Sequence, residues 1–212
     1  MWPKGETTQE ILAEVRSGDA DAVNRLLERH RESVKRLVKM RLDTRIQKRL
    51  DVSDVVQDVM VEAHRRLSGY LENPVLDFHL WLRQIARDRI IDAHRRHRGS
   101  DKRSVDREQP NQLPAGMDHS TMDLAAQLMD REITPAAAAA QRELAQVVEQ
   151  ALVRLDEAEH EIILMRHYEQ LTNQEVAAVL GLSEPAASMR YLRAIRKLRS
   201  FFGGAVPESD ST

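Results

Sequence analysis

Cysteine is absent from this sequence of 212 residues, and proline (seven residues), glycine (eight) and aromatic residues (4%) are scarce. The absence of cysteine excludes disulfide bonds, thiolate metal sites and cysteine nucleophiles, and it favours a reducing compartment, the cytoplasm. No apolar run approaches the roughly 18–20 residues that span a bilayer, and no secretory signal is visible at the amino terminus. Hydrophobic residues still reach 42%. Long stretches rich in Ala, Leu, Glu and Arg predict an all-α fold.

Charge is balanced in total but not along the chain. The 32 basic and 34 acidic residues give a net charge of −2. Residues 83–103 carry eight basic and three acidic groups, and Arg190–Arg199 carries five basic groups and no acid. Between them, residues 104–160 carry four basic and eleven acidic groups. Two basic islands separated by an acidic stretch predict two nucleic-acid contacts, although basic residues on solvated helix faces would give the same counts.

The first part of the chain reads as a compact helical domain over residues 8–98. A long helix is predicted because apolar residues, with one histidine, recur at three- and four-residue steps. They are Val23, Leu26, Leu27, His30, Val34, Leu37, Val38 and Leu42. A second helix is predicted between an N-cap at Ser53 and a stop at Ser68-Gly69. Its inward residues are expected to be Val56, Val59, Met60, Ala63 and Leu67.

A loop over Gly69–Asp77 is predicted next, because Pro74 disfavours helical geometry at Asn73. A third helix should follow, ending in a basic tail. Its inward residues are expected to be Phe78, Trp81, Leu82, Ile85 and Ala86.

Residues 99–134 are predicted to form a flexible acidic linker, because their first part is too poor in apolar groups to offset the entropy of ordering. One short helix is predicted inside this stretch from Met122, Ala125, Ala126, Met129 and Ile133. Thr134-Pro135 is a typical helix start. A second small domain is therefore expected over residues 135–202, followed by a disordered tail over residues 203–212.

The second domain carries the signature of a helix-turn-helix. Thr172 and Glu175 fit a capping box, which starts one helix. Gly181 stands where the chain must reverse with a positive φ, and Ser183 caps the next helix. This spacing places a recognition helix in the major groove, and its arginines would contact phosphates or guanine. A structural helical hairpin with a basic outer face is the alternative.

Taken together, the motifs resemble two regions of bacterial sigma factors. Region 2 is suggested by Asp54-Val55-Val56-Gln57-Asp58-Val59, by Phe78-x-x-Trp81-Leu82-x-x-Ile85-Ala86-Arg87, and by Asp92 followed by Arg95-Arg96-His97-Arg98. Region 4 is suggested by Leu155-Asp156-Glu157, by Tyr168-Glu169-Gln170-Leu171-Thr172, and by the helix-turn-helix. With only a linker between the two regions, the chain resembles the extracytoplasmic-function (ECF) group of the sigma-70 family.

The resemblance implies two partners, core RNA polymerase and promoter DNA, and one surface for each contact. Asp54, Gln57 and Asp58 would bind the coiled-coil clamp of the polymerase large subunit. The −10 element would be melted and held by Arg83, Arg87, Asp88, Arg95, Arg96 and Arg98, with a flipped base in the Gly69–Asp77 loop. The −35 element would be read by Glu184, Ser188, Met189, Arg190, Arg193, Arg196 and Lys197. The family usually has asparagine in place of Asp88 and a basic residue in place of Ser188.

Neither an enzyme nor a cofactor is expected, because no phosphate-binding loop and no nucleophile motif is present. His94, His97 and Asp92 have the spacing of a metal site, but the surrounding arginines would repel a cation. An ordinary helix-turn-helix regulator with a sensing or dimerisation domain, and a helical adaptor, remain as alternatives. Family members are commonly held by an anti-sigma factor, which is a further expected partner.

Overall fold

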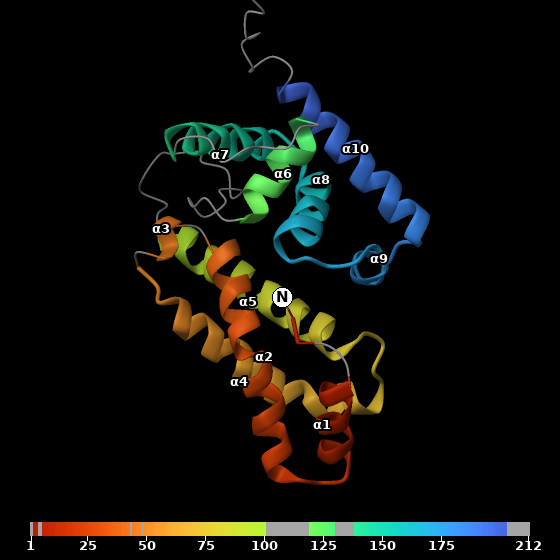
Figure 1. The fold of residues 1–212 in the computed structure, drawn as a ribbon. Coiled ribbons are helices and arrows are strands. Elements are labelled where there is room, and N and C mark those ends of the chain that lie inside the picture. The colour runs from red at the N-terminus through yellow and green to blue at the C-terminus, as the bar shows by residue number, and fades with distance from the viewer. Residues whose placement is uncertain are drawn as a thin grey trace, which may run out of the picture. The chain divides into compact units, whose positions relative to one another are not determined.

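The computed structural model describes residues 2–3, 6–42, 44–47, 49–100, 119–129 and 138–202, and every regular element in these ranges is a helix (Figure 1). This confirms the predicted all-α class. The described residues fall into two compact units, one within Met1–Pro114 and one within Ala115–Thr212. None of the helices in these ranges is both long and apolar enough to span a membrane.

The first unit is built around two long helices, with a third packed against both. Its elements are α1 (Glu6–Arg16), α2 (Ala20–Arg41), α3 (Thr44–Gln47), α4 (Val52–Glu72) and α5 (Phe78–Ser100). Helices α2, α4 and α5 contact one another, and α1 packs on α2. Nearly all of the predicted stripe residues are buried, so the helical periodicity correctly identified the core. Val23 and Trp81 are half-buried exceptions.

Both predicted ends of the second helix are wrong by a few residues. Asp51, not Ser53, is the N-cap of α4, and its Oδ1 accepts a hydrogen bond of 2.8 Å from the Ser53 amide. The helix then continues through Ser68-Gly69 and ends at Glu72, with Asn73 as its C-cap. Gly69 is tolerated inside the helix because a glycine there only weakens it, whereas Pro74 enforces the stop. The connecting loop is therefore residues 73–77.

The second unit contains α6 (His119–Met129), α7 (Ala138–Val153), α8 (Glu157–Ile163), η1 (Leu164–Tyr168), α9 (Asn173–Leu180) and α10 (Glu184–Phe202). Element η1 follows α8 directly and is a π-helical turn. Asp156 and Glu159 form a capping box at the start of α8. Predicted stripe residues Val148, Ala151, Leu152 and Leu155 are buried, whereas Leu144 and Val147 are half-buried.

Helix α6 corrects the linker prediction at residues 119–129. It packs against α7, η1 and α10 instead of being free chain. Its buried apolar residues are Leu124, Ala125 and Leu128, whereas Met122, Ala126 and Met129 are only half-buried. The predicted stripe was therefore correct at Ala125 and misplaced elsewhere. Ile133 and the Thr134-Pro135 start lie outside the described residues.

The helix-turn-helix forms as predicted. Thr172 and Glu175 make both bonds of the capping box on α9, and Gly181 follows in the left-handed conformation with φ of 63°. The Leu182 amide then donates to the Ala177 carbonyl at 2.9 Å. Ser183 caps the next helix, since its Oγ accepts from the Ala186 amide at 3.3 Å. These bonds are all local, which is why the sequence pattern alone could predict this turn.

Candidate nucleic-acid and protein interfaces

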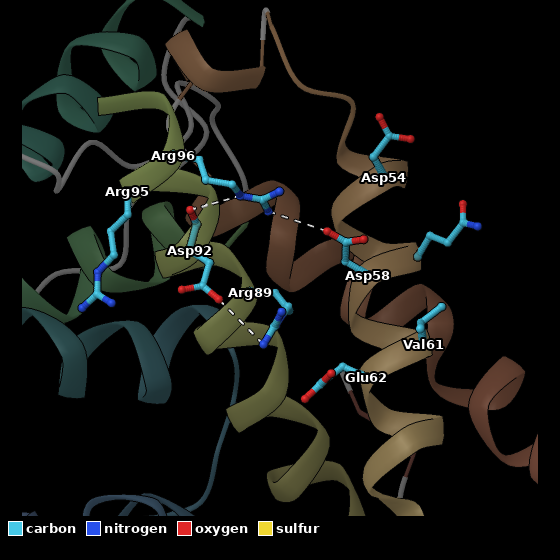
Figure 2. Close-up of a pocket in the computed structure, with 9 residues that line it drawn as sticks. Asp54, Asp58, Val61, Glu62, Arg89, Asp92, Arg95 and Arg96 are labelled. Atoms are coloured by element: carbon cyan, nitrogen blue, oxygen red, sulfur yellow. Dashed lines mark hydrogen bonds and ion pairs between the residues drawn. The ribbon is translucent and has the colours of Figure 1, made fainter. Parts of the chain in front are cut away.

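One face of α4 carries exposed acceptor groups beside a hollow. Asp54, Gln57 and Asp58 are all exposed, and the three- and four-residue steps between them place them on one side of the helix. The hollow lies between α4 and α5 and has a volume of about 690 Å³ (Figure 2). It is lined by Asp54, Gln57, Asp58, Val61, Glu62, Arg89, Asp92, Arg95 and Arg96. The structure thus brings the three predicted polymerase-binding residues together with part of the predicted DNA-binding set.

Val61 belongs to this face and was not predicted. Its side chain is 62% exposed, one helical turn beyond Gln57 and Asp58. Val61 is thus a single exposed apolar side chain on an otherwise polar helix face. The signal was present in the sequence, because Val61 continues the step from Asp54 through Asp58 and falls outside the buried stripe.

Glu62 anchors two arginines at the edge of the hollow. Its carboxylate accepts hydrogen bonds of 3.1 and 2.7 Å from Arg65 and a further one from Arg66. The Arg65 guanidinium holds the pKa of Glu62 at about 2, outweighing the effect of partial burial. The carboxylate therefore stays charged at any physiological pH, and it forms its ion pairs with arginines of the same helix, α4.

The basic side chains of α5 differ in whether they form ion pairs with carboxylates. Arg87, Asp88, Arg95 and Arg96 are all exposed. Arg96 lies 3.7 Å from the Asp58 carboxylate, and Arg89 lies 3.7 Å from Asp92. Figure 2 shows Arg96 reaching toward Asp58 while Arg95 points away. The first of these pairs therefore joins a predicted polymerase-binding residue to a predicted DNA-binding residue.

Arg83, predicted to contact DNA, is buried in the first unit. It is 1% exposed, because it shares the inner face of α5 with Ala86 and Ile90, three and seven residues later. A buried guanidinium is not accessible to a phosphate. The side chain of Arg98, another predicted contact, lies outside the described residues.

The loop over residues 73–77 is tied to the aromatic core of the first unit. Tyr70 donates a hydrogen bond of 3.1 Å to the Leu76 carbonyl, and its ring lies 4.7 Å from that of Trp81. Val75, at the loop tip, is 78% exposed. The loop thus has a fixed base on aromatic rings and an apolar tip in solvent.

The exposed face of α10 differs from the predicted one. Met189, Leu192, Arg193 and Arg196 are exposed along it, as is Glu184 at its start. Ser188 and Arg190 are half-buried at its margins. Lys197 turns toward α8, where its Nζ lies 2.6 Å from Glu159 and 3.8 Å from Asp156. The hydrogen bond to Glu159 raises the pKa of Lys197, so the ammonium group is charged and paired with a carboxylate of α8 in this structure.

A chain of polar side chains holds α10 from its inner side. His167 Nε2 lies 2.9 Å from the Tyr191 hydroxyl, which donates a bond of 3.1 Å to Gln127 on α6. Burial lowers the pKa of His167 to about 4, so the imidazole is neutral at physiological pH. Sequence reasoning missed this chain because its members lie on three separate helical elements. Its effect is to fix the recognition helix against η1 and α6.

The part of the chain that the structure describes holds no group of three metal-ligating side chains. His94 Nε2 lies 3.4 Å from the Arg41 carbonyl. The side chain of His97 lies outside the described residues.

Comparison with known proteins identifies both units. Residues 26–100 match the family described as Sigma-70 region 2, and residues 151–200 match Sigma-70 region 4. Together these two ranges cover more than half of the chain.

Individual relatives agree with these matches. The chain is 33% identical to the RNA polymerase sigma factor CnrH of Cupriavidus metallidurans over 150 residues, which is 70% of this chain and 71% of CnrH. It is 27% identical to the ECF RNA polymerase sigma factor SigD of Mycobacterium tuberculosis over 201 residues, which is 94% of this chain and 85% of SigD. A solved structure of CnrH in complex with the cytosolic domain of CnrY matches with a TM-score of 0.56 at 25% identity, covering 95% of this chain and 100% of that one. The protein therefore belongs to the ECF group of the sigma-70 family, the sigma factors that direct RNA polymerase to specific promoters.

Proposed function

We propose that the exposed face of α4 formed by Asp54, Gln57, Asp58 and Val61 docks this sigma factor on core RNA polymerase, in the cytoplasm. The observation that carries the proposal is the combination of three acceptor side chains and one exposed valine on a single helix face. Carboxylates offset by one turn match arginines on a partner helix, and the valine supplies an apolar contact between them.

The neighbouring surface of the first unit is proposed to hold the −10 element and to help melt it. Exposed Arg87, Arg95 and Arg96 offer cations to the backbone of a single strand. Asp88 stands beside them as an acceptor only. The loop over residues 73–77, with Val75 at its tip, is the proposed site for a base taken out of the stack. Arg83 is buried and lies outside this exposed surface.

In the second unit, α10 is proposed to read the −35 element. Exposed Arg193 and Arg196 supply the phosphate or guanine contacts, with Arg190 at the margin of the face. Glu184 and Ser188 lie nearer the start of the helix, where recognition helices contact base edges. Lys197 is assigned to the fold of the unit because of its ion pair with Glu159.

The polymerase-docking proposal is tested by charge reversal. Asp54→Lys combined with Asp58→Lys should weaken association with purified core enzyme at least tenfold, because truncating close charge pairs at an interface has effects of this size. Run-off transcription from a cognate promoter should fall in parallel. Glu10→Lys, an equally exposed reversal on α1, is the matched control and should leave both readouts unchanged. Unaltered core binding by the double variant would refute the docking site.

The same transcription assay separates the sigma function from an ordinary regulator. A sigma factor gives promoter-specific product only when core enzyme and this chain are both present. A regulator would instead protect an operator without polymerase.

A regulatory protein partner is a second proposal, and it rests on CnrH, which was solved in complex with the cytosolic domain of CnrY. By analogy, this chain would bind an anti-sigma factor. Affinity purification of the tagged chain from its native host should recover one such protein in a stoichiometric complex that lacks core enzyme. Recovery of core enzyme alone would contradict this proposal.

A further inference from the structure

The centre of the exposed face of α10 is apolar. Met189 is 52% exposed and Leu192 is 43% exposed. Successive residues of an α-helix are rotated by about 100° about the helix axis. Met189 therefore points in a direction between those of Arg193 and Arg196, and away from the buried side of the helix. Among the described residues only four large hydrophobic side chains are this exposed, and two of them share this one face.

The apolar centre of this face and the arginines around it together indicate which kind of partner the face binds. Arg190–Arg199 contains no acidic residue, so the face attracts a polyanion more than a typical protein surface. In the major groove, thymine is the base that presents an apolar group, its C5-methyl. Methionine and leucine placed over other base edges would remove water from donors and acceptors without replacing the hydrogen bonds. The geometry thus favours thymines beneath these two side chains.

We propose that Met189 and Leu192 determine promoter specificity by contacting thymine methyl groups in the upstream element. This inference rests on the proposed DNA-reading role of α10 and adds to it the kind of base that is read. The flanking Arg193 and Arg196 hold the backbone or neighbouring guanines, so they position the helix while the apolar pair discriminates.

The test replaces thymine by deoxyuridine, which differs only in lacking the methyl group. Promoter duplexes are first selected by the full chain with core polymerase from a pool randomised in the upstream element. Each upstream thymine of a selected duplex is then changed to deoxyuridine, and the affinity of the complex is measured by fluorescence anisotropy. Each contacted methyl should contribute about fourfold to affinity, the usual effect of burying one such group.

Variants of the two side chains decide whether they make the contact. In the variant that combines Met189→Ala with Leu192→Ala, the deoxyuridine penalty, which is the loss of affinity when thymine is replaced by deoxyuridine, should disappear. The duplex should still bind this variant, because the arginines of α10 are retained. Met189→Leu is the matched control and should retain the penalty, because it keeps an apolar side chain of similar volume. Both original side chains are exposed, so neither change should disturb folding.

The possible failures are distinguishable. If selected duplexes bind equally well with thymine and deoxyuridine, or if the penalty persists unchanged in the double alanine variant, the methyl-contact inference is wrong although α10 still reads DNA. If the pool shows no enrichment in the upstream element, the DNA-reading function of the second unit is wrong, and this inference with it. If the double alanine variant no longer binds core polymerase, the face belongs to a protein partner and the methyl-contact inference is wrong.

Discussion

At the scale of single residues, His30 is an unusual member of the first core. Its ring is fully buried, lies 5.0 Å from the Phe78 ring, and neither ring nitrogen has a hydrogen-bond partner. Burial lowers the pKa of His30 to about 4, with smaller contributions from His79 and Arg29. The histidine therefore packs as a neutral ring, which is how it could share a helical stripe with valines and leucines.

This burial predicts a pH dependence of the first unit. The unfolded chain takes up the His30 proton near pH 6.5 and the folded chain only near pH 4, so the unfolded state binds more protons between these values. The contribution of His30 to the free energy of unfolding is thus fully present above pH 6.5 and falls by about 3 kcal/mol as the pH drops to 4. His30→Leu should flatten this part of the pH profile.

Urea denaturation followed by tryptophan fluorescence measures this effect in one unit only. The chain has two tryptophans, Trp2 and Trp81, and both lie in the first unit. His64→Gln changes an exposed histidine and should leave the slope between pH 4 and pH 6.5 as it is in the unchanged protein. An identical slope in His30→Leu would show that His30 is not the titrating group.

Single positions also mark where sequence reasoning was insufficient. Arg83 and Lys197 are basic residues in basic stretches, and charge patterns predicted both as DNA contacts. Their actual positions depend on which side of the helix packs and on partners far away in the sequence, such as Glu159 for Lys197. No local pattern contains that information.

At the scale of elements, Gly181 and Gly69 make a matched pair. Gly181 adopts φ of +63° at the end of α9, whereas Gly69 lies inside α4, and an added Cβ would meet no atom within 4 Å at either position. Gly181→Ala should therefore destabilise the second unit by about 1–2 kcal/mol through backbone strain alone. Gly69→Ala should stabilise the first unit by about 0.5–1 kcal/mol. Thermal unfolding followed by circular dichroism gives the melting temperatures of both variants. Equal shifts of the melting temperature with the same sign would contradict the conformations assigned to the two glycines.

Helix α6 is the element that the sequence placed least well, and it gives the next prediction. Leu124 is completely buried against the second unit, so Leu124→Ala should reduce the stability of that unit by about 2–5 kcal/mol. Met122→Ala, at a half-buried position on the same helix, should have a much smaller effect. If both variants unfold like the unchanged chain, residues 119–129 act as linker, as the sequence suggested.

The difference between the helix-turn-helix and α6 explains what sequence patterns could predict. The turn is specified by Thr172, Glu175 and Gly181, which bond to groups within a few residues. Helix α6 is specified by contacts to Tyr168 and Tyr191, more than forty residues away. Composition therefore predicted a linker, because an isolated helix of eleven residues is marginal in water without such packing.

At the scale of the whole molecule, each unit has its own core and its own candidate surface. The proposed polymerase-docking face of α4 and the arginines of α5 lie in the first unit, and the proposed DNA-reading face of α10 lies in the second. Neither unit alone carries both of the proposed promoter contacts. If both proposed contacts form, the covalent connection makes the second binding event intramolecular, with an effective concentration in the range of about 1 mM.

This connection can be tested by cutting it. A site for a specific protease inserted between residues 105 and 112 should leave an active sigma factor before cleavage. After cleavage, each piece should keep its helicity by circular dichroism, because the buried residues of each unit form a core of their own. Run-off transcription at micromolar concentrations should nevertheless fall by at least tenfold, since the second unit then binds from dilute solution instead of from about 1 mM. Added excess of the second piece should restore part of the output. Full output from the cleaved protein without such an excess would show that polymerase alone assembles the pieces, and helicity lost on cleavage would show that the units do not fold separately.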